Sequence, residues 1–202
     1  YDFEAWTSQP NGASDCNASN DLAVLEDISS PLCGHYDIGG GNGFPDFNSA
    51  LDAMVLAGVT CSVVFDVAPG EYDESVDLSN IDIDPAYSLS FQSQSGNTND
   101  TSLSYSGSLN HTLRLAGNQN VSFANLSIER LDGYHNVIVY DSSAVSFDNC
   151  VLYNSSSIGN GTQIYGLEVS DTTDVTISNS DIEVRNTNNW SNSFARGATF
   201  SN

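Results

Sequence analysis

Two aspartates stand at positions where their spacing would support chemistry. Asp141 and Asp171 each follow a short alternating apolar stretch at the same offset, and Gly117 holds the equivalent place earlier in the chain. If these stretches stack as neighbouring parallel strands, the two carboxylates lie one strand spacing apart, ~4.8 Å. Like charges at that distance repel each other, and a divalent cation relieves the repulsion. The spacing therefore predicts half of a Ca²⁺ site or a contact to a sugar. The alternative is a pair of solvated loop acids that point apart.

The three histidines show no pattern that indicates a metal site or nucleophilic catalysis. His35, His111 and His135 lie in unrelated contexts without the spacing of metal ligands. No Gly-x-Ser-x-Gly turn accompanies them. The glycine-rich stretch 39–43 does not fit a phosphate-binding P-loop, because that motif needs a lysine and the sequence has none. We predict surface or turn histidines and a flexible glycine turn.

The four cysteines are too few for a disulfide scaffold and form no Cys-x-x-Cys pair. Cys33 and Cys61 flank the segment that leads into the regular part of the chain, and we predict a disulfide between them. A Cys16–Cys33 bridge is the rival pairing. Either bridge requires an oxidising compartment outside the cytoplasm. Cys150 is predicted to be a free, buried thiol.

Three copies of one motif indicate the elements that position these side chains. The motif V-x-[FI]-x-N-x-x-[IL] occupies residues 121–128, 145–152 and 175–182, at intervals of 24 and 30 residues. An alternating apolar pair begins eight residues before each copy. Alternation of this kind marks strands with one buried face, and its repetition marks the stacked coils of a solenoid. The sequence therefore predicts an all-β solenoid.

The asparagine of each motif copy is predicted to turn the chain between strands. Asn125, Asn149 and Asn179 occupy the same place in the three copies. Asparagine tolerates the left-handed conformation that a sharp bend needs, and its amide can bond to the coil above or below. We predict a structural ladder of these three amides that satisfies backbone groups at the bend.

Residues 46–57 form the one convincing helix, and it precedes the coils. Asp46 is a good N-cap, and Gly58 can end the helix in the left-handed conformation. Phe47, Leu51, Met54 and Val55 are predicted to share its apolar face. Such a helix would cover the end of the first coil, which is otherwise exposed to water.

The charge of the chain excludes some classes of partner. The sequence has 26 acidic residues against four arginines, so its net charge is -22. Nucleic acids and anionic membranes need positive charge on the protein, so neither is expected as a partner, and we expect no insertion into a membrane. An acidic surface favours solubility in salt and the binding of divalent cations. It also fits an acidic surface-layer protein from a salt-loving organism.

The stretch 39–72 carries a family resemblance. It contains the predicted helix, a Gly-Val pair, an apolar strand and the sequence Pro69-Gly70-Glu71-Tyr72. This order resembles the entry to right-handed parallel β-helix, or pectin-lyase-like, proteins, among them pectin methylesterases and secreted bacterial repeat proteins. Together with the coils that follow, the resemblance covers about 170 residues. It implies a right-handed parallel β-helix with an N-terminal capping helix at about 46–57.

The catalytic motifs of these families do not accompany the resemblance. Pectin methylesterases use two aspartates and an arginine in motifs of the type G-Y-Q-D-T and D-F-I-F-G, and neither motif occurs. β-Helix polysaccharide lyases use arginine or lysine as the base. Arg114 and Arg130 are available, but neither stands in a recognisable lyase motif. We therefore predict no catalytic residue.

We expect residues 29–202 to form the β-helix domain, truncated at its C-terminal end. Residues 1–28 resemble the closing strands of an immunoglobulin-like adhesion module, or form a simple N-terminal extension.

The preferred interpretation is a structural or adhesive segment of a large secreted or surface-anchored repeat protein, with possible binding of a polysaccharide or cell-surface glycan. A carbohydrate-active enzyme whose active site is incomplete in this segment is the alternative. Several aromatic residues near the coil edges would stack on sugars or cover the flank: Tyr134, Tyr140, Tyr153, Tyr165 and Trp190.

Overall fold

The computed structural model describes residues 3–6, 22–25, 30–41, 43–117, 119–157, 163–171, 174–187 and 194–201. The chain divides into two compact units, 1–31 and 32–202. In the first unit, β1 (Phe3–Trp6) and β2 (Leu22–Leu25) form an antiparallel pair. Cys16, and with it the rival disulfide, lies outside the described residues. The assignment of this unit to an adhesion module stays a prediction.

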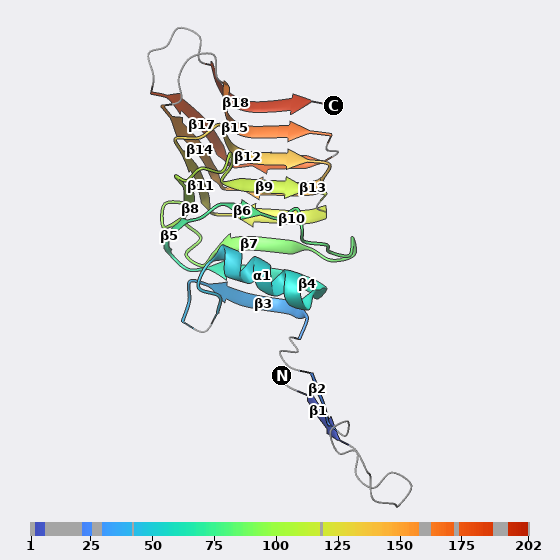
Figure 1. Cartoon of the computed structure of the whole chain (residues 1–202). Helices are drawn as coiled ribbons and strands as arrows, with labels where there is room; N and C mark the ends of the chain where they lie inside the picture. The colour runs from blue at the N-terminus through green and yellow to red at the C-terminus, as the bar shows by residue number, and fades with distance from the viewer. Residues whose placement is uncertain are drawn as a thin grey trace, which may run out of the picture. The chain divides into compact units, whose positions relative to one another are not determined.

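The second unit is a parallel β-helix, which confirms the predicted fold class. Three parallel sheets form its sides, and from β4 onward each turn of the chain adds one strand to each sheet (Figure 1). Sheet 1 contains β3 (Leu32–Ile38), β4 (Val59–Val67), β7 (Leu89–Ser93), β10 (Gln119–Ala124), β13 (Ser143–Asp148) and β16 (Val175–Ser178). Sheet 2 contains β5 (Gly70–Asp73), β8 (Thr101–Tyr105), β11 (Ser127–Leu131), β14 (Val151–Ser156) and β17 (Asp181–Asn186). Sheet 3 contains β6 (Val76–Asp77), β9 (Leu113–Ala116), β12 (His135–Tyr140), β15 (Gln163–Ser170) and β18 (Phe194–Ser201).

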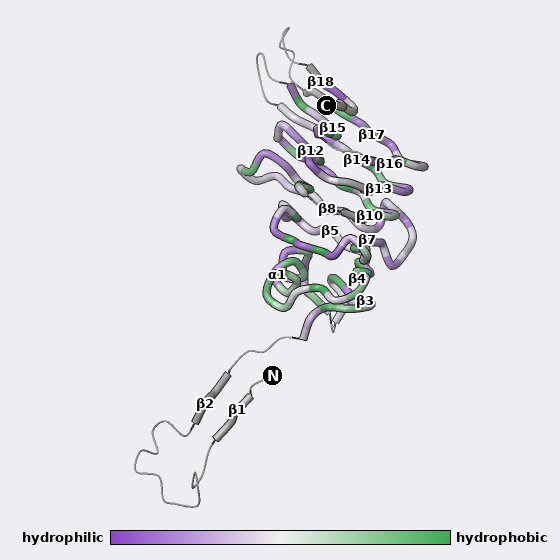
Figure 2. The backbone as a smooth tube through the Cα atoms, turned by 90° about the vertical axis from the view of Figure 1, so that its right-hand side faces the viewer, coloured by the Kyte–Doolittle hydropathy of each residue, from purple (hydrophilic) through white to green (hydrophobic). Residues whose placement is uncertain are grey.

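The core consists of columns of like residues that run through successive coils. Hydrophobic and hydrophilic stretches alternate along the tube because one side of each strand faces inward (Figure 2). The clearest column is the phenylalanine column of sheet 1, in which adjacent ring centroids lie 5.1, 5.3 and 5.3 Å apart. All of its members are buried: Phe65, Phe91, Phe123 and Phe147.

The motif asparagines form the bends from sheet 1 to sheet 2, as predicted from their type. Asn125, Asn149 and Asn179 have φ angles of 58°, 49° and 51°, in the left-handed region. Asn149 Nδ2 donates to Asn125 Oδ1 over 2.7 Å, but Asn179 Nδ2 donates to Asp148 Oδ1 over 2.9 Å. The amide ladder therefore has one link between asparagines. At the next coil the charged carboxylate of Asp148 is the acceptor instead.

The only helix among the described residues is α1 (Phe47–Ala57), at the start of the coils. Asp46 caps it by accepting a hydrogen bond from the Ser49 amide, and Glu74 accepts bonds from the two backbone amides at 47 and 48. The ring of Phe47 packs 5.7 Å from that of Phe91, the second member of the phenylalanine column, and the ring of Phe44, just before the helix, lies 5.9 Å from that of Phe65 at its end. The apolar face of α1 is narrower than predicted, because Val55 is 60% exposed.

A disulfide joins Cys33 of β3 to Cys61 of β4, the two strands at the entry to the β-helix. Such a bridge fits an oxidising compartment. Cys150 is free and buried, and its thiol lies 3.5 Å from the carbonyl oxygen of Phe123. No helix in the described part of the chain has the length and apolar character to cross a membrane.

Candidate functional site: the outer face of sheet 3

The outer face of sheet 3 brings together polar and aromatic side chains from four successive coils. Strand register places Asp77 beside Arg114, Arg114 beside Ile138, and Ile138 beside Glu168. The inward residues of these strands are apolar and fix the outward direction of their neighbours; Leu113 and Leu115, for example, are fully buried on either side of Arg114. We call this surface the sheet-3 face, made of Asp77, Arg114, His135, Tyr140, Tyr165 and Glu168.

Arg114 is the centre of the first half of the sheet-3 face. Its Nη1 donates to Asp77 Oδ2 over 2.8 Å, and its Nη2 donates to the hydroxyl oxygen of Tyr140. The guanidinium carbon also lies 5.1 Å from the centre of the Tyr140 ring. The hydrogen bond to Asp77 raises the pKa of Arg114 above its ordinary value. Burial opposes ionisation of Asp77, but hydrogen bonds from Ser79 and Arg114 outweigh it and lower the pKa of that carboxyl.

His135 is the centre of the second half. Its Nδ1 lies 2.8 Å from Glu168 Oε2, and its ring stacks on that of Tyr165 at 5.0 Å with an angle of 1° between the planes. Burial lowers the pKa of His135, although the neighbouring Glu168 opposes this change. At neutral pH the imidazole is therefore uncharged, and its Nδ1 lies close to the carboxylate of Glu168 without the geometry of a hydrogen bond.

A buried arginine fixes the turn beside the sheet-3 face. Arg130 is 2% exposed and donates to the backbone carbonyls of Tyr105, Gly107 and Leu109. Burial lowers its pKa, and its guanidinium carbon lies 4.9 Å from the ring centre of Tyr105. Three hydrogen bonds to consecutive parts of one loop indicate a structural role. Arg130 therefore positions the 106–112 turn and is not a free base.

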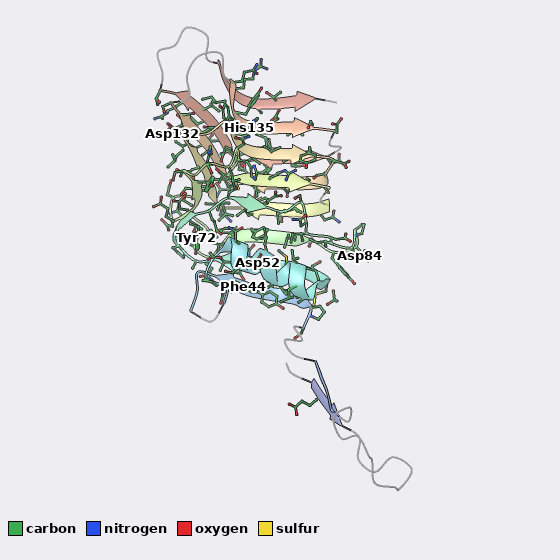
Figure 3. The ribbon with its side chains drawn as sticks, viewed as in Figure 1. Phe44, Asp52, Tyr72, Asp84, Asp132 and His135 are labelled. Carbon is green, nitrogen blue, oxygen red and sulfur yellow. A yellow bond between two sulfur atoms is a disulfide. The ribbon has the colours of Figure 1, made fainter. Side chains whose placement is uncertain are left out.

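His111 lies next to this turn, where sheet 2 passes into sheet 3. Its carbonyl oxygen accepts a hydrogen bond from Ser75 Oγ over 2.9 Å. Burial lowers the pKa of His111, and its Nε2 has no hydrogen-bond partner in the part of the chain that the structure describes. Asp132 and His135 lie at the same corner one coil further on (Figure 3). The two histidines therefore belong to neighbouring rungs of one corner, which their sequence contexts did not indicate.

The two aspartates with the predicted metal spacing lie on adjacent rungs at the bend from sheet 3 to sheet 1. The pairing of Tyr140 with Ser170 places Asp141 beside Asp171. Both are exposed, with φ angles of 48° and 50°, and Gly117 of the preceding coil has φ 72°. This bend needs the left-handed conformation, which explains their residue types without a ligand. No group of three or more His, Cys, Asp or Glu side chains suited to a metal occurs among the described residues, so the Ca²⁺ half-site stays a prediction.

The predicted aromatic cluster divides between two sheets. Tyr140 and Tyr165 lie on the sheet-3 face. Tyr153 lies on sheet 2, where the guanidinium carbon of Arg185 is 5.6 Å from its ring centre. Tyr134 is 39% exposed in the turn before β12, and Trp190 lies outside the described residues. Two of the five aromatics therefore contribute rings to one surface.

A second polar cluster lies on the outer face of sheet 1, close to the capping helix. Asp66 accepts from Gln92 over 2.6 Å and lies 3.0 Å from His35 Nδ1, while Gln94 donates to Asp37 over 2.9 Å. A shallow pocket is lined there by His35, Tyr36, Asp37 and Gly43. The side chain of His35 is 67% exposed. These contacts link three neighbouring strands of sheet 1 (β3, β4 and β7), which indicates a structural role in holding successive coils together.

Sequence reasoning missed Asp77 and Glu168, the two acids of the sheet-3 face. Their partners lie 37 and 33 residues away, so neither pair belongs to a local motif. A signal was present, however. Asp77 follows Val76 as Arg114 follows Leu113, and Glu168 follows Leu167 in the same way. Aligning the apolar pairs of all coils, including the less regular first one, would have placed these residues in one column.

Comparison with known proteins gives a resemblance at the level of the fold. No protein-family model matches the sequence, and no curated protein is similar to it. Among solved structures, the chain resembles the pectin methylesterase of Aspergillus niger in a penultimately deglycosylated form, with 18% identity over 87% of this chain and 69% of that one and a TM-score of 0.41. The deglycosylated form of that enzyme gives 14% identity over 87% of this chain and 88% of that one, with a TM-score of 0.39. At these identities the resemblance concerns the fold alone.

Proposed function

We propose that this chain is a glycan-binding segment of a secreted or surface-anchored protein, with an adhesive or structural role, and that the sheet-3 face is its binding surface. One observation carries the proposal. Partly exposed aromatic rings stand beside two pairs of closely spaced polar groups on the strands of a rigid β-helix. The bridge between Cys33 and Cys61 supports an oxidising location outside the cytoplasm.

The chemistry of the sheet-3 face suits a sugar. The rings of Tyr165 and His135 cover one face of each other, and together they form an aromatic patch with polar atoms against which the C–H groups of a pyranose can pack. Asp77, Arg114 and Glu168 offer hydrogen bonds to hydroxyl groups, and charge-assisted bonds of this kind are the strong ones. Because strands hold these groups, little conformational entropy is lost when a ligand binds.

The stacking of coils also determines how the groups of the sheet-3 face are arranged along the axis of the β-helix. Equivalent residues repeat at the strand spacing of ~4.8 Å along the axis of the β-helix. The sheet-3 face spans the strands β6, β9, β12 and β15, so its groups form a row along that axis. An extended oligosaccharide lying along the axis would contact several rungs at once, which is the geometry expected for a polymer ligand.

The proposal is tested with a glycan array and a pair of matched variants. Tyr165→Ala removes a ring from the sheet-3 face, and Tyr153→Ala removes an equivalent outward ring from sheet 2. We expect the parent and Tyr153→Ala to bind the same glycans, and Tyr165→Ala to bind at least tenfold more weakly. Circular dichroism checks that both variants are folded. Equal binding by all three proteins, or equal loss in both variants, would contradict the assignment of the surface.

The His135–Glu168 pair favours one second candidate function, a carbohydrate-active enzyme. A carboxylate that holds the Nδ1 side of an imidazole leaves Nε2 free to accept a proton, as a general base does. If this function holds, incubation with bound glycans yields unsaturated or de-esterified products by mass spectrometry, and His135→Gln abolishes them. Binding without any product favours the adhesive function.

A further inference from the structure

We propose that Asn99 and Asn110 are acceptor sites for N-linked glycans. This inference goes beyond the proposed function and shares with it only the location outside the cytoplasm. The acceptor motif is Asn-x-Ser/Thr, in which the middle residue is not proline. It occurs eight times, at residues 17, 99, 110, 120, 125, 154, 160 and 189. A chain rich in asparagine, serine and threonine also forms this motif by chance, so the environment of each side chain must decide which copies are open.

Three of these asparagines are held by the fold. Asn154 is 0% exposed, and its Nδ2 donates to two backbone carbonyl oxygens over 2.8 and 3.3 Å. Nδ2 of Asn120 donates to a backbone carbonyl oxygen over 2.6 Å. Asn125 is half-buried in the amide ladder, where its Oδ1 accepts from Asn149. An N-linked glycan replaces one hydrogen of Nδ2 and needs open space beyond it, so these three environments oppose the modification.

Asn99 and Asn110 have the opposite environment. Both are exposed, and no residue in the described part of the chain forms a hydrogen bond with either side-chain amide. Asn99 lies in segment 94–100 between β7 and β8, and Asn110 lies in segment 106–112 between β8 and β9. The equivalent connections in the next coil, 125–126 and 132–134, are shorter. The two open motifs therefore lie in two long loops of one coil, where a bulky hydrophilic group projects away from the core columns.

The threonine of each open motif determines when the glycan is added. Thr101 and Thr112 are both 0% exposed. Thr101 Oγ1 lies 2.8 Å from Ser93 Oγ, and Thr112 Oγ1 donates to the carbonyl oxygen of Glu129 over 2.8 Å. The hydroxyl group is part of the motif that the oligosaccharyltransferase recognises, and the folded coil hides it. The glycan is therefore added to the unfolded chain, and the folded protein accommodates it because both asparagines are exposed.

The reaction needs one co-reactant, an oligosaccharide that is joined to a lipid through a phosphate or pyrophosphate. Nδ2 of the asparagine forms a bond to the anomeric carbon of the first sugar, and the bond from that carbon to the phosphate oxygen breaks. The lipid phosphate leaves with the bonding electron pair, and the amide nitrogen gives up one proton to a base of the transferase. Nothing is oxidised or reduced. The modification belongs to secreted proteins, and the bridge between Cys33 and Cys61 fits the same location.

Mass spectrometry of the whole chain, secreted from its natural host, tests the assignment. Peptide mapping is expected to show mass increments of whole sugar residues at Asn99 and Asn110, and none at the three asparagines held by the fold. Asn99→Gln and Asn110→Gln should each remove one glycan from the intact mass. Asn97→Gln is the matched control, because Asn97 is exposed in the same loop as Asn99 but lies outside the motif. An unmodified Asn99 or Asn110, or a glycan at Asn154 of the folded chain, would overturn the inference.

A reaction with purified oligosaccharyltransferase tests the order of modification and folding. Unglycosylated whole chain is offered with a lipid-linked oligosaccharide, either folded or diluted from denaturant with its disulfide reduced. We expect at least tenfold more transfer to the unfolded chain, at both Asn99 and Asn110, because only that chain exposes the hydroxyl groups of Thr101 and Thr112. Equal transfer to the two forms would contradict the protection by folding. No transfer to the unfolded chain would contradict both acceptor sites.

Discussion

The phenylalanine column and the sheet-3 face run along the same coils and follow opposite rules. The column repeats one residue type at four consecutive rungs, Phe65 to Phe147, with rings 5.1 to 5.3 Å apart. The outward column of sheet 3 changes at every rung, from Asp77 to Arg114, Ile138 and Glu168. Like residues stack favourably when they are apolar or, as with Asn149 and Asn125, when they can hydrogen-bond to each other, whereas stacked charges must alternate in sign or be separated. Repetition therefore marks the part of the chain that stabilises the fold, and variation marks the part that we propose to bind a ligand.

Breaking the phenylalanine column has the largest expected effect. Phe123 lies between two other rings of the column and is 1% exposed, so Phe123→Ala leaves a cavity that the stack cannot close. We expect a loss of about 3–5 kcal/mol in the free energy of unfolding, measured by denaturant titration. Arg114→Ala, on the outer face, should cost about 1 kcal/mol or less, because exposed pairs contribute little. Equal losses for the two variants would contradict the division between stability and binding.

Removing the disulfide at the entry to the β-helix is expected to cause the next largest loss of stability. Cys33 and Cys61 are separated by 28 residues, and their bridge restricts the unfolded chain. The double variant Cys33→Ser, Cys61→Ser is expected to lose about 2–5 kcal/mol of stability. A reducing agent should lower the melting temperature of the parent by a similar amount and leave the double variant unchanged. If the reducing agent destabilises both proteins equally, the bridge is not the cause.

The asparagine bend gives a smaller and more specific effect. Asn149 has a φ of 49° and donates to Asn125, so Asn149→Leu places a branched side chain in the left-handed region and removes that bond. We expect a loss of about 1–2 kcal/mol. Asn149→Gly is the control, since glycine adopts this φ freely and isolates the contribution of the amide. If Asn149→Leu melts at the temperature of the parent, the bend interpretation is wrong.

The regular features could be predicted from the sequence, because repetition makes each of them visible several times. The β-helix follows from the apolar alternation, and the bends follow from the asparagines at 125, 149 and 179. The pairs of the sheet-3 face occur once each and join residues far apart in the sequence, so only the register reveals them. Val55 was predicted to be buried because it fits the helical period, but the apolar face of α1 is narrower than that period allows.

The loss of stability at low pH tests the burial of His111 and His135 at the corner between sheets 2 and 3. Burial lowers the pKa values of His111 and His135, so the folded state prefers both imidazoles uncharged. Their contribution to stability is complete above the ordinary pKa of about 6.5 and is lost as the pH falls through the folded values. The groups near His111 are Asp77, which opposes the lowering, and Arg114, Arg130 and His135, which favour it.

Thermal melting as a function of pH measures this effect. The parent should lose stability as the pH falls from about 7 to 5, and His111→Phe should lose less over the same interval because one titrating ring is gone. His35→Phe is the control, because His35 is largely exposed on sheet 1. An identical pH dependence in the parent and in His111→Phe would contradict a contribution from this histidine.

The smallest expected effect is the weak binding of Ca²⁺ to the predicted half-site. Asp141 and Asp171 supply two exposed carboxylates, and sites with so few charged ligands bind Ca²⁺ with dissociation constants of about 1 mM or weaker. Calorimetry should show weak binding that Asp171→Ala removes. If Ca²⁺ produces no heat with the parent, or the same heat with the variant, the two aspartates serve only as bend residues.

The turns from sheet 2 to sheet 3 have a consequence for engineering. Segment 106–112 and segment 132–134 connect the same two sheets in neighbouring coils, yet they differ in length. The coils on either side keep their register across this difference, because each coil contacts only its neighbours. A foreign loop inserted at 132–134 would lie beside His135, outside the core columns. The β-helix thus offers a position at which new ligand contacts can be grafted, on the condition that the insertion keeps the hydrogen bonds that Asp132 accepts from Ser157.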